Sequence, residues 1–521
     1  MKNKSFYAII VLVWCISSCK KDFISLTPQT QLSSATYFKT ADQFQQALTG
    51  VYQALRGWAE PSSWLMGETR SDNTRYDYNP LIATVAGLER QSVADWTDDA
   101  YNSTTKTKYT SDYTGIERAN IILDQIANAK IDSTIKNTIT GESEVLRAFF
   151  YFDLVQFYGG VPLNVHTVSN PSQAFLPRSP VEDVYAQIIT DLKDAITKLP
   201  QKVTFSQTGH VTIGTAETLL ANVYMVQKKF DQAATLLQAV TQLGYSLNAN
   251  YANAFSTTNK NSAESIFEVQ YKQGAADGQW SAFIYDFIPP MVNSTIVTGT
   301  NTNTTSLPSG QNLPTADLVA SYEPGDKRLD ASIGVIVGHY DATATFVADS
   351  VVSIVGYPHP VPSYTGPGGV VSKLFVKKYL HPSTTPFQTD DDWPIYRYSE
   401  ALLMLAESLN EQGKSMEALP YLNQVRVRAG LPPSTETDQT LLRVIIAHER
   451  RIELAFENKR WTDLLRTGQV IPGMTAFSTT LKQNNPNVPA NAYNLATFRL
   501  LFPIPETEIQ LNPKITQNPG Y

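Results

Sequence analysis

The chain has 521 residues, 42% hydrophobic residues and a formal net charge of −7. This length is enough for a large core or for more than one domain, and the composition is ordinary for a globular protein. The acidic balance and the lack of a basic run argue against a nucleic-acid partner.

The first 18 residues are typical of a bacterial lipoprotein signal peptide. Lys2 and Lys4 precede an apolar run over residues 6–16, which is too short to span a bilayer. The run ends in ISSC (16–19), an aliphatic residue and two small residues before a cysteine. We predict cleavage before Cys19, lipidation of that residue and anchoring in a membrane. An ordinary signal peptide with an incidental cysteine is the alternative.

Apolar residues recur at helical spacing in four segments of the first half, after a polar tether over residues 19–33. These segments cover residues 36–57, 115–128, 142–158 and 181–199. The third has a ring-rich face, which we interpret as core rather than as a cofactor site. Residues 68–79 are polar and rich in turn formers, so we expect an exposed loop there.

Two stretches share the packing pattern of a helical hairpin. Residues 215–244 and 393–430 both match the tetratricopeptide repeat, with Ala221 and Ala406 at its eighth place. In the second stretch, the apolar face of the first helix is formed by Ile395, Tyr398, Leu402, Leu405 and Leu409, and Ser415 is the expected N-cap of the next helix. A hairpin cannot bury its apolar face alone, so we predict a mainly α scaffold of stacked hairpins.

The composition changes near residue 256, where Thr, Ser, Asn, Gly and Pro become frequent. Brief β-type runs at 265–271 and 374–379 interrupt this region. We predict a loop-rich, variable lobe, because loops carried on a scaffold are where binding residues usually lie. The expected organisation is a signal peptide (1–18), a lipidated tether (19–33), an N-terminal helical region (34–255), the lobe (256–392) and a C-terminal helical region with a tail (393–521).

Several longer motifs follow one another in a specific order. They are the cysteine at 19, GESEVLRAFFYFDLVQFYGGVPL (141–163), RSPVEDVYAQIITDL (178–192), ESIFEVQ (264–270), LPTADLVASYEPGDKRLDASI (313–333), RYSEALLMLAESLNE (397–411), ERRIELAFENKRWTDLLRTG (449–468) and PIPETEIQLNPKITQNPGY (503–521). Together they resemble the SusD/RagB family of outer-membrane nutrient-binding lipoproteins over nearly the whole chain. The resemblance implies tetratricopeptide-like units that cradle a variable lobe. It also implies a location at the cell exterior and a partner, a SusC-like TonB-dependent outer-membrane transporter.

Two loop regions combine aromatic rings with polar side chains, as sugar-binding sites do. A ring stacks on the flat C–H face of a sugar, and amide, carboxylate or guanidinium groups bind its hydroxyls. The candidate ligand-binding residues are Arg75, Tyr76, Tyr78, Trp96 and Asn102 in the first region, and Trp280, Tyr285 and Asn293 in the second. We predict that they capture an oligosaccharide or glycan fragment. A RagB-like peptide-binding protein and a protein-only tetratricopeptide-like scaffold remain alternatives.

Three glutamates, Glu449, Glu453 and Glu457, share one helix face, and two of them could form a glycosidase pair. Ion pairing with neighbouring arginines is the simpler interpretation. The run 390–392, three aspartates, lacks the spacing of a calcium loop, so we expect a solvated turn and predict no cofactor, although a structural calcium ion is conceivable. No other catalytic or metal-binding motif is present, so we predict a binding protein and not an enzyme.

Overall fold

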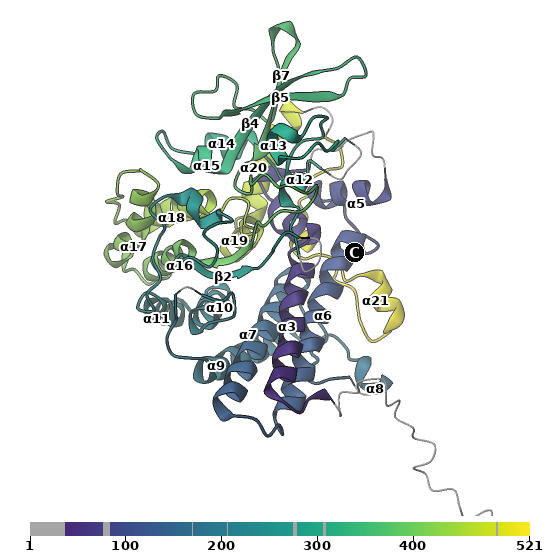
Figure 1. Cartoon of the computed structure of the whole chain (residues 1–521), viewed down its shortest axis with the longest axis vertical. Coiled ribbons are helices and arrows are strands. Elements are labelled where there is room, and N and C mark those ends of the chain that lie inside the picture. The colour runs from purple at the N-terminus through teal and green to yellow at the C-terminus, as the bar shows by residue number, and fades with distance from the viewer. Residues whose placement is uncertain are drawn as a thin grey trace, which may run out of the picture.

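The computed structural model describes residues 37–76, 84–168, 170–205, 207–274, 279–305, 309–485 and 488–521. Helices dominate, and a small sheet projects at one end (Figure 1), which confirms the predicted mainly α fold class. Cys19 and Tyr78 lie outside the described residues. Within those residues, no helix combines the length and the apolar character needed to cross a membrane.

Four long helices form the lower body of the molecule (Figure 1). They are α3 (Ala41–Trp58), α6 (Ser103–Ile126), α7 (Ser133–Tyr158) and α9 (Val181–Lys198). Helices α6 and α7 begin earlier than the apolar spacing predicts, because their first turns are polar and are capped by Asn102 and Asp132. The ring-rich face of α7 is buried, as predicted, with Tyr151 and Phe152 in the core.

Both predicted hairpins are present and stand next to each other. The first is α10 (Ile213–Val226) with α11 (Phe230–Val240), and the second is α16 (Tyr398–Glu411) with α17 (Ser415–Arg428), followed by α18 (Gln439–Glu453). Ala221, Ala406, Leu402 and Leu405 are fully buried, which confirms the packing positions. The assignment of Ser415 as an N-cap is wrong, because it lies inside α17 and its hydroxyl lies 2.8 Å from Asn410 Oδ1.

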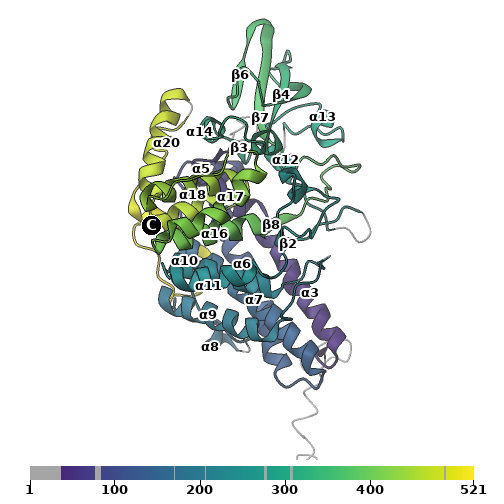
Figure 2. The ribbon, with the colours of Figure 1, turned by 90° about the vertical axis from the view of Figure 1, so that its left-hand side faces the viewer.

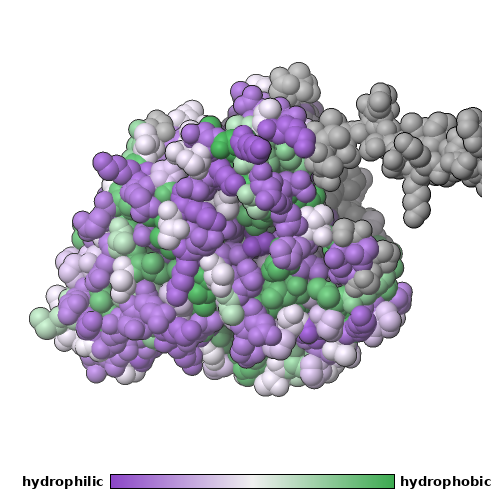
Figure 3. All heavy atoms as spheres, turned by 90° about the horizontal axis from the view of Figure 1, so that it is seen from below, coloured by the Kyte–Doolittle hydropathy of each residue, from purple (hydrophilic) through white to green (hydrophobic). Residues whose placement is uncertain are grey.

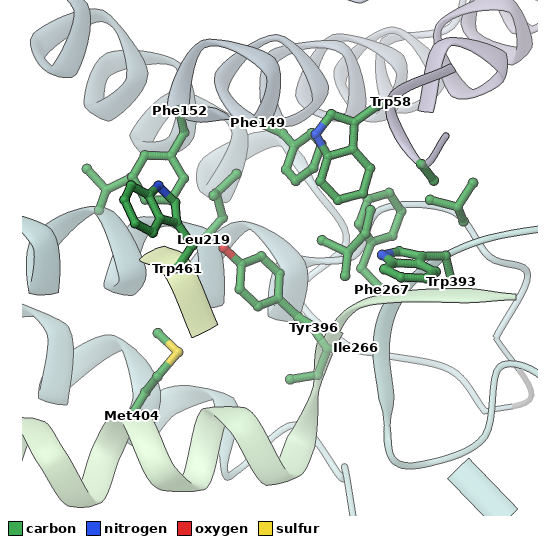
Figure 4. Packing of buried hydrophobic residues seen from close by; sticks show 14 of the residues in the cluster. Trp58, Phe149, Phe152, Leu219, Ile266, Phe267, Trp393, Tyr396, Met404 and Trp461 are labelled. Carbon is green, nitrogen blue, oxygen red and sulfur yellow. The ribbon is translucent and has the colours of Figure 1, made fainter. Parts of the chain in front are cut away.

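A continuous aromatic and aliphatic core joins the N-terminal helices to the C-terminal ones (Figure 4). It includes Trp58 and Phe149 from α3 and α7, Leu219 from α10, Trp393 and Tyr396 from β8 (Trp393–Arg397), Met404 from α16 and Trp461 from α19 (Arg460–Thr467). Ile395 belongs to β8 rather than to a helix, because this stretch pairs with β2 (Ser265–Val269) before the chain turns into α16. The two ends of the chain therefore share one core.

A four-stranded antiparallel sheet projects from the helical body at the top of Figures 1 and 2. Its strands are β4 (Ile333–Tyr340), β5 (Phe346–Ser353), β6 (Ser363–Thr365) and β7 (Val370–Val376), in the order β5-β4-β7-β6. The sequence predicted only brief β-type runs here. The strands are longer because Val and Ile side chains form a second core with Ile284 and Met291, which the surrounding Gly- and Thr-rich composition obscured.

Residues 62–74 are buried, so the expectation of an exposed loop over 68–79 is wrong where the structure describes it. This segment contains α4 (Pro61–Trp64) and the π-helix η2 (Leu65–Thr69). Its polar groups find partners far along the chain, as when Arg460 Nε donates to Asp72 Oδ1 at 2.7 Å. Long-range pairing of this kind allows a polar segment to be buried.

The other elements connect or cover these layers. They are β1 (Thr74–Arg75), α5 (Val85–Ala94), α8 (Pro171–Ala174), η4 (Tyr251–Phe255), α12 (Phe283–Phe287), α13 (Thr295–Thr298), β3 (Leu313–Pro314), α14 (Ala316–Ala320), α15 (Arg328–Ser332), η5 (Pro367–Gly369), α20 (Val470–Asn484), η6 (Thr497–Leu500) and α21 (Glu506–Leu511). Seen from below, the helical end shows apolar residues in separate patches among hydrophilic ones (Figure 3).

Candidate ligand-binding site

Trp96 is a core residue in the structure, not an exposed platform. Its side chain is fully buried, its Nε1 donates to Arg70 O at 3.0 Å, and its ring packs edge-on against Trp461. The Arg70 guanidinium lies 4.6 Å from the centre of the Trp96 ring. The expectation that this ring meets a ligand is therefore wrong, because the polar neighbours that suggested exposure are themselves buried.

Asn102 has a structural role at the start of α6. Its Oδ1 accepts hydrogen bonds from Thr104 N at 2.9 Å and Thr105 N at 3.2 Å, and the residue is buried. A side chain that caps a helix in this way has no acceptor left for a sugar hydroxyl. The expectation that Asn102 contacts a ligand is also wrong in this structure.

The other candidates of the first region are held by protein contacts. Arg75 Nη1 donates to Tyr493 Oη at 2.9 Å, and its Nη2 lies 3.5 Å from Asp95 Oδ1. Tyr76 is buried, with only 5% of its surface exposed. The contacts of Arg75 tie the strand β1 to the end of α5 and to the C-terminal segment. Arg75 and Tyr76 therefore hold parts of the chain together and do not form a free binding surface.

Tyr285 is buried in the second core, where its hydroxyl lies 2.7 Å from Thr300 Oγ1. Asn293 is exposed, but its Nδ2 donates to Ala348 O at 3.0 Å and so links its loop to β5. The predicted residues of the two regions are therefore mostly structural, and they do not form one exposed set.

Trp280 differs from the other candidates because 44% of its surface is exposed. The other tryptophans within the described residues are buried: Trp58, Trp64, Trp96, Trp393 and Trp461. An exposed indole of this size is unusual in a globular protein, because its burial would contribute a large hydrophobic free energy. The exposure fits the predicted role of this ring as a stacking surface.

The backbone on both sides of Trp280 is fixed. On one side, Lys272 N donates to Gln279 O at 2.9 Å. On the other side, Ser281 and Thr389 exchange two backbone hydrogen bonds, at 3.1 and 2.8 Å. The ring therefore projects from a hydrogen-bonded support rather than from an unsupported loop, as a preorganised binding residue should.

Arg56, in the last turn of α3, connects this support to the scaffold. Its Nε donates to Gln270 O at 3.0 Å, and its Nη1 donates to Gln279 Oε1 at 3.4 Å. Burial lowers the pKa of the Arg56 guanidinium, while the nearby Tyr271 and Asp392 act in the opposite direction. The guanidinium is thus partly dehydrated and held beside the residue that precedes Trp280.

These contacts define a surface that we call the Trp280 platform, made of Arg56, Gln270, Lys272, Gln279 and Trp280. Its side chains are one indole, two amides and two cations, and the contacts join Arg56 to Gln270 and Gln279. Lys272, Gln279 and Trp280 are exposed, and Arg56 and Gln270 are half-buried. Sequence reasoning found the tryptophan and missed the rest, because α3 and the segment around 270–280 are far apart in the chain.

The aspartates at 390–392 support the platform from behind, and the expectation of a solvated turn is wrong. Asp391 is fully buried. Asp392 Oδ1 accepts hydrogen bonds from Tyr271 N at 2.7 Å and Lys260 Nζ at 2.8 Å. Burial and the nearby Glu268 raise the pKa of Asp392 to about 7. In the part of the chain that the structure describes, no three His, Cys, Asp or Glu side chains are grouped to hold a metal ion.

The three glutamates of α18 and its C-terminal end are buried in an ion-pair network. Glu453 alone is paired with Arg328, Arg397 and Arg428, and Glu449 and Glu457 are equally enclosed. The network confirms that the glutamates form ion pairs. The sequence suggested arginines close to them in the chain, but most of their partners lie on other elements. Because these carboxylates are not exposed, they are not placed to meet a glycan.

An open groove of about 910 Å³ lies beside the projecting sheet, between α14–α15 and residues 353–361. It contains Tyr357 and Tyr322, but its acidic residues already have partners. Glu323 Oε1 lies 2.7 Å from Arg426 Nη1, and Asp330 Oδ2 lies 3.0 Å from Lys377 Nζ. The Trp280 platform, which has an exposed indole on a hydrogen-bonded support, is the better candidate for ligand capture.

Two family models match the chain in sequence. Residues 263–521 match the model described as "SusD family", and residues 22–225 match the model described as "Starch-binding associating with outer membrane". The chain belongs to the SusD/RagB family. As a SusD-family protein it is related to glycan-binding proteins that associate with the outer membrane.

Individual relatives align with most of this SusD-family chain. SusD-like protein P38 of Formosa agariphila is 25% identical, over 100% of this chain and 99% of the relative. Starch-binding protein SusD of Bacteroides thetaiotaomicron is 22% identical, over 78% of this chain and 76% of the relative. A solved laminarin-binding SusD-like protein superposes with a TM-score of 0.72 at 25% identity, covering 93% of this chain and 100% of the other.

Proposed function

We propose that this protein is a cell-surface lipoprotein that captures an oligosaccharide at the Trp280 platform. The observation that carries the proposal is the exposed Trp280 ring on a fixed support, where the preceding residue, Gln279, is bound by the Arg56 guanidinium. A ring and several hydrogen-bonding groups are what a sugar needs. The starch- and laminarin-binding names of two relatives support a glycan ligand.

In this proposal, the captured glycan passes to a SusC-like TonB-dependent transporter in the outer membrane. The resemblance to SusD/RagB proteins supports this step. The sequence ISSC at 16–19 supports a lipid anchor at Cys19, and the family description supports outer-membrane association. An anchored binding protein that faces the cell exterior would raise the local concentration of ligand at the transporter.

The protein binds its ligand without cleaving it, in this proposal. The candidate acid pair among Glu449, Glu453 and Glu457 is buried and paired, which supports a structural role. The peptide-binding alternative uses the same surface, since aromatic and amide groups also bind peptides. A ligand panel must therefore contain both kinds of molecule.

The test measures binding of a glycan panel and a peptide mixture to the native protein, Trp280→Ala and Tyr101→Ala. Tyr101 is a matched control, because it is 71% exposed and lies between α5 and α6, outside the platform residues. We expect at least severalfold weaker glycan binding in Trp280→Ala, unchanged binding in Tyr101→Ala and unchanged melting temperatures. Binding of peptides alone, or full glycan affinity in Trp280→Ala, would contradict the proposal.

A further inference from the structure

The position of the Trp280 ring depends on the backbone that carries it. Across the described ranges of the chain, no hydrogen bond, ring stacking or cation contact holds the Trp280 side chain itself. The backbone is bound instead, at residues 271–273 and at Ser281, the residue that follows the ring. The groups that hold this backbone therefore determine where the ring lies.

Two carboxylates hold the backbone from one side. Asp392 Oδ1 accepts a hydrogen bond from Tyr271 N at 2.7 Å. Asp390 Oδ1 accepts one from Gln273 N at 2.6 Å. The N–H of Lys272, which lies between them in the chain, donates to a backbone carbonyl at 2.9 Å on the other side. Alternate N–H groups thus face opposite sides, as in a β-strand, and on one side carboxylates take the place of the carbonyl groups of a partner strand.

Both carboxylates are engaged by the protein. Asp390 Oδ2 accepts a hydrogen bond from the side-chain amide of Gln273 at 2.8 Å. Asp392 Oδ1 also accepts from Lys260 Nζ at 2.8 Å, and Asp392 Oδ2 is buried. The two carboxylates are therefore directed at the protein, and they can influence a ligand through the segment that carries Trp280.

We propose that Asp390 and Asp392 position Trp280 for ligand capture, by binding through their carboxylates the backbone N–H groups of the segment that carries the ring. This inference rests on the proposed function and adds to it the residues that control the ring. A backbone that is fixed on both sides keeps its side chain in one place, and such preorganisation reduces the entropy that binding would otherwise cost. Loss of either hydrogen bond would reduce the fraction of molecules whose ring is placed to bind.

The experiment separates the hydrogen-bond acceptor of each carboxylate from its charge. Asp390→Ala and Asp392→Ala remove the acceptor, whereas Asp390→Asn and Asp392→Asn keep an acceptor oxygen. Asp341→Ala is the matched control, because Asp341 Oδ1 also accepts from two backbone N–H groups, at 2.8 and 3.0 Å, in the turn between β4 and β5. Calorimetry with oligosaccharides of laminarin and of starch measures the affinity of the native protein and of each variant. Hydrogen exchange, which needs no ligand, measures the protection of residues 270–274.

We expect both alanine variants of the aspartates to bind at least severalfold more weakly, and both asparagine variants to bind within about twofold of the native protein. Asp341→Ala should bind like the native protein. Residues 270–274 should exchange faster in the alanine variants of Asp390 and Asp392. Melting temperatures should stay near the native value, because Asp390 is half-buried and the Lys260 side chain, 24% exposed, can reach water.

A double-mutant cycle shows whether the aspartates act through the ring. In a Trp280→Ala background, Asp390→Ala and Asp392→Ala should weaken binding no further, because the ring that they position is absent. Direct contact of either carboxylate with the ligand would make the effects add, which would overturn the inference. Unchanged protection of residues 270–274 in the alanine variants would overturn it as well.

Two results separate this inference from the proposed function. If Trp280→Ala weakens glycan binding while Asp390→Ala and Asp392→Ala bind like the native protein, the proposed function stands and the inference is wrong. If no glycan binds, or if Trp280→Ala binds as tightly as the native protein, the proposed function fails and the inference, which rests on it, fails with it.

Discussion

Arg397 Nη1 lies 3.0 Å from Glu453 Oε1, and Arg397 Nη2 donates to Glu453 O at 3.0 Å, and both side chains are buried. These two contacts link the end of β8 to the end of α18. Burial alone would raise the pKa of Glu453, but Arg428, Arg397 and Arg328 together hold it below its usual range. The carboxylate therefore stays ionised in the core.

Arg397→Met should unfold the protein at moderate temperature. The change leaves Glu264, Glu453 and Glu457 with fewer cationic partners, and breaking a buried pair costs about 3–5 kcal/mol. Arg443→Met is the control, because that side chain is 44% exposed and its pair with Glu411 lies at the surface. Denaturant titrations followed by circular dichroism measure both. Equal stability of the two variants would contradict a structural role for the network.

Leu402→Asp and Leu405→Asp should each unfold the scaffold, whereas Gln412→Ala should not. Both leucines are fully buried in α16, and an unpaired buried carboxylate costs several kcal/mol, roughly half of a typical domain's stability. Gln412 is only partly buried. Thermal melting distinguishes the variants, and Asp variants that melt within a few degrees of the native protein would show that the core assignment is wrong.

Trp96→Ala and Trp280→Ala should behave in opposite ways. Trp96 is fully buried beneath Arg70 and Trp461, so its truncation should cost about 3–5 kcal/mol of stability. Trp280 is 44% exposed, so its truncation should leave the melting temperature near the native value and weaken ligand binding. Calorimetry and melting curves on the same two variants give the comparison. Loss of stability in Trp280→Ala alone would reverse the assignment.

Asp286 makes stability depend on pH. Burial raises the pKa of its carboxyl to about 7, and Arg90 acts in the opposite direction. Since an unfolded Asp has a pKa of about 3.9, the folded state binds the proton more tightly. The resulting stabilisation is full below about pH 4 and is lost as pH rises through 7.

The stability of Asp286→Asn relative to the native protein should therefore be greater at pH 8 than at pH 5, by on the order of 1–3 kcal/mol. Glu417→Gln is the control, because that residue is exposed on α17. Urea titrations at both pH values measure the difference. A gain that is the same at pH 5 and pH 8 would exclude the titration of Asp286 as its cause.

Cys19→Ala should release the protein from membranes. The ISSC sequence at 16–19 predicts lipidation at this residue, and several acyl chains hold a protein firmly in a bilayer. Metabolic labelling with palmitate and membrane fractionation measure the effect. Continued labelling and membrane retention of the variant would show that the anchor lies elsewhere.

Helical periodicity predicted the scaffold well, because apolar spacing is a local property. Leu402, Leu405 and Ala406 are buried where the repeat pattern places them. Exposure of polar segments was less predictable, since it depends on partners far away. Asp72 is buried because Arg460 reaches it across 388 positions in the chain. The polar neighbours of Trp96 suggested that it is exposed. One of them, Asp98, is instead buried in an ion pair with Arg70, which the sequence does not reveal.

The candidate site, too, depends on contacts between distant parts of the chain that the sequence does not reveal. Trp280 was predicted from a loop of aromatic and polar residues, and its exposure fits that prediction. Arg56 was not predicted, because it lies in a helix whose other residues indicate packing. Only the fold brings it to Gln279, 223 positions later.

The pairing of β2 with β8 places Val269 opposite Trp393 on adjacent strands, although 123 residues separate them. The polypeptide between them leaves the helical body at β2 and returns to it at β8, on strands about 5 Å apart. Within this segment, β3 pairs with β1, and Arg328 is ion-paired with Glu449 and Glu453 of α18. Replacing the segment with that of a relative would therefore also require the relative's residues in β1 and α18, so the lobe and the scaffold have to diverge together.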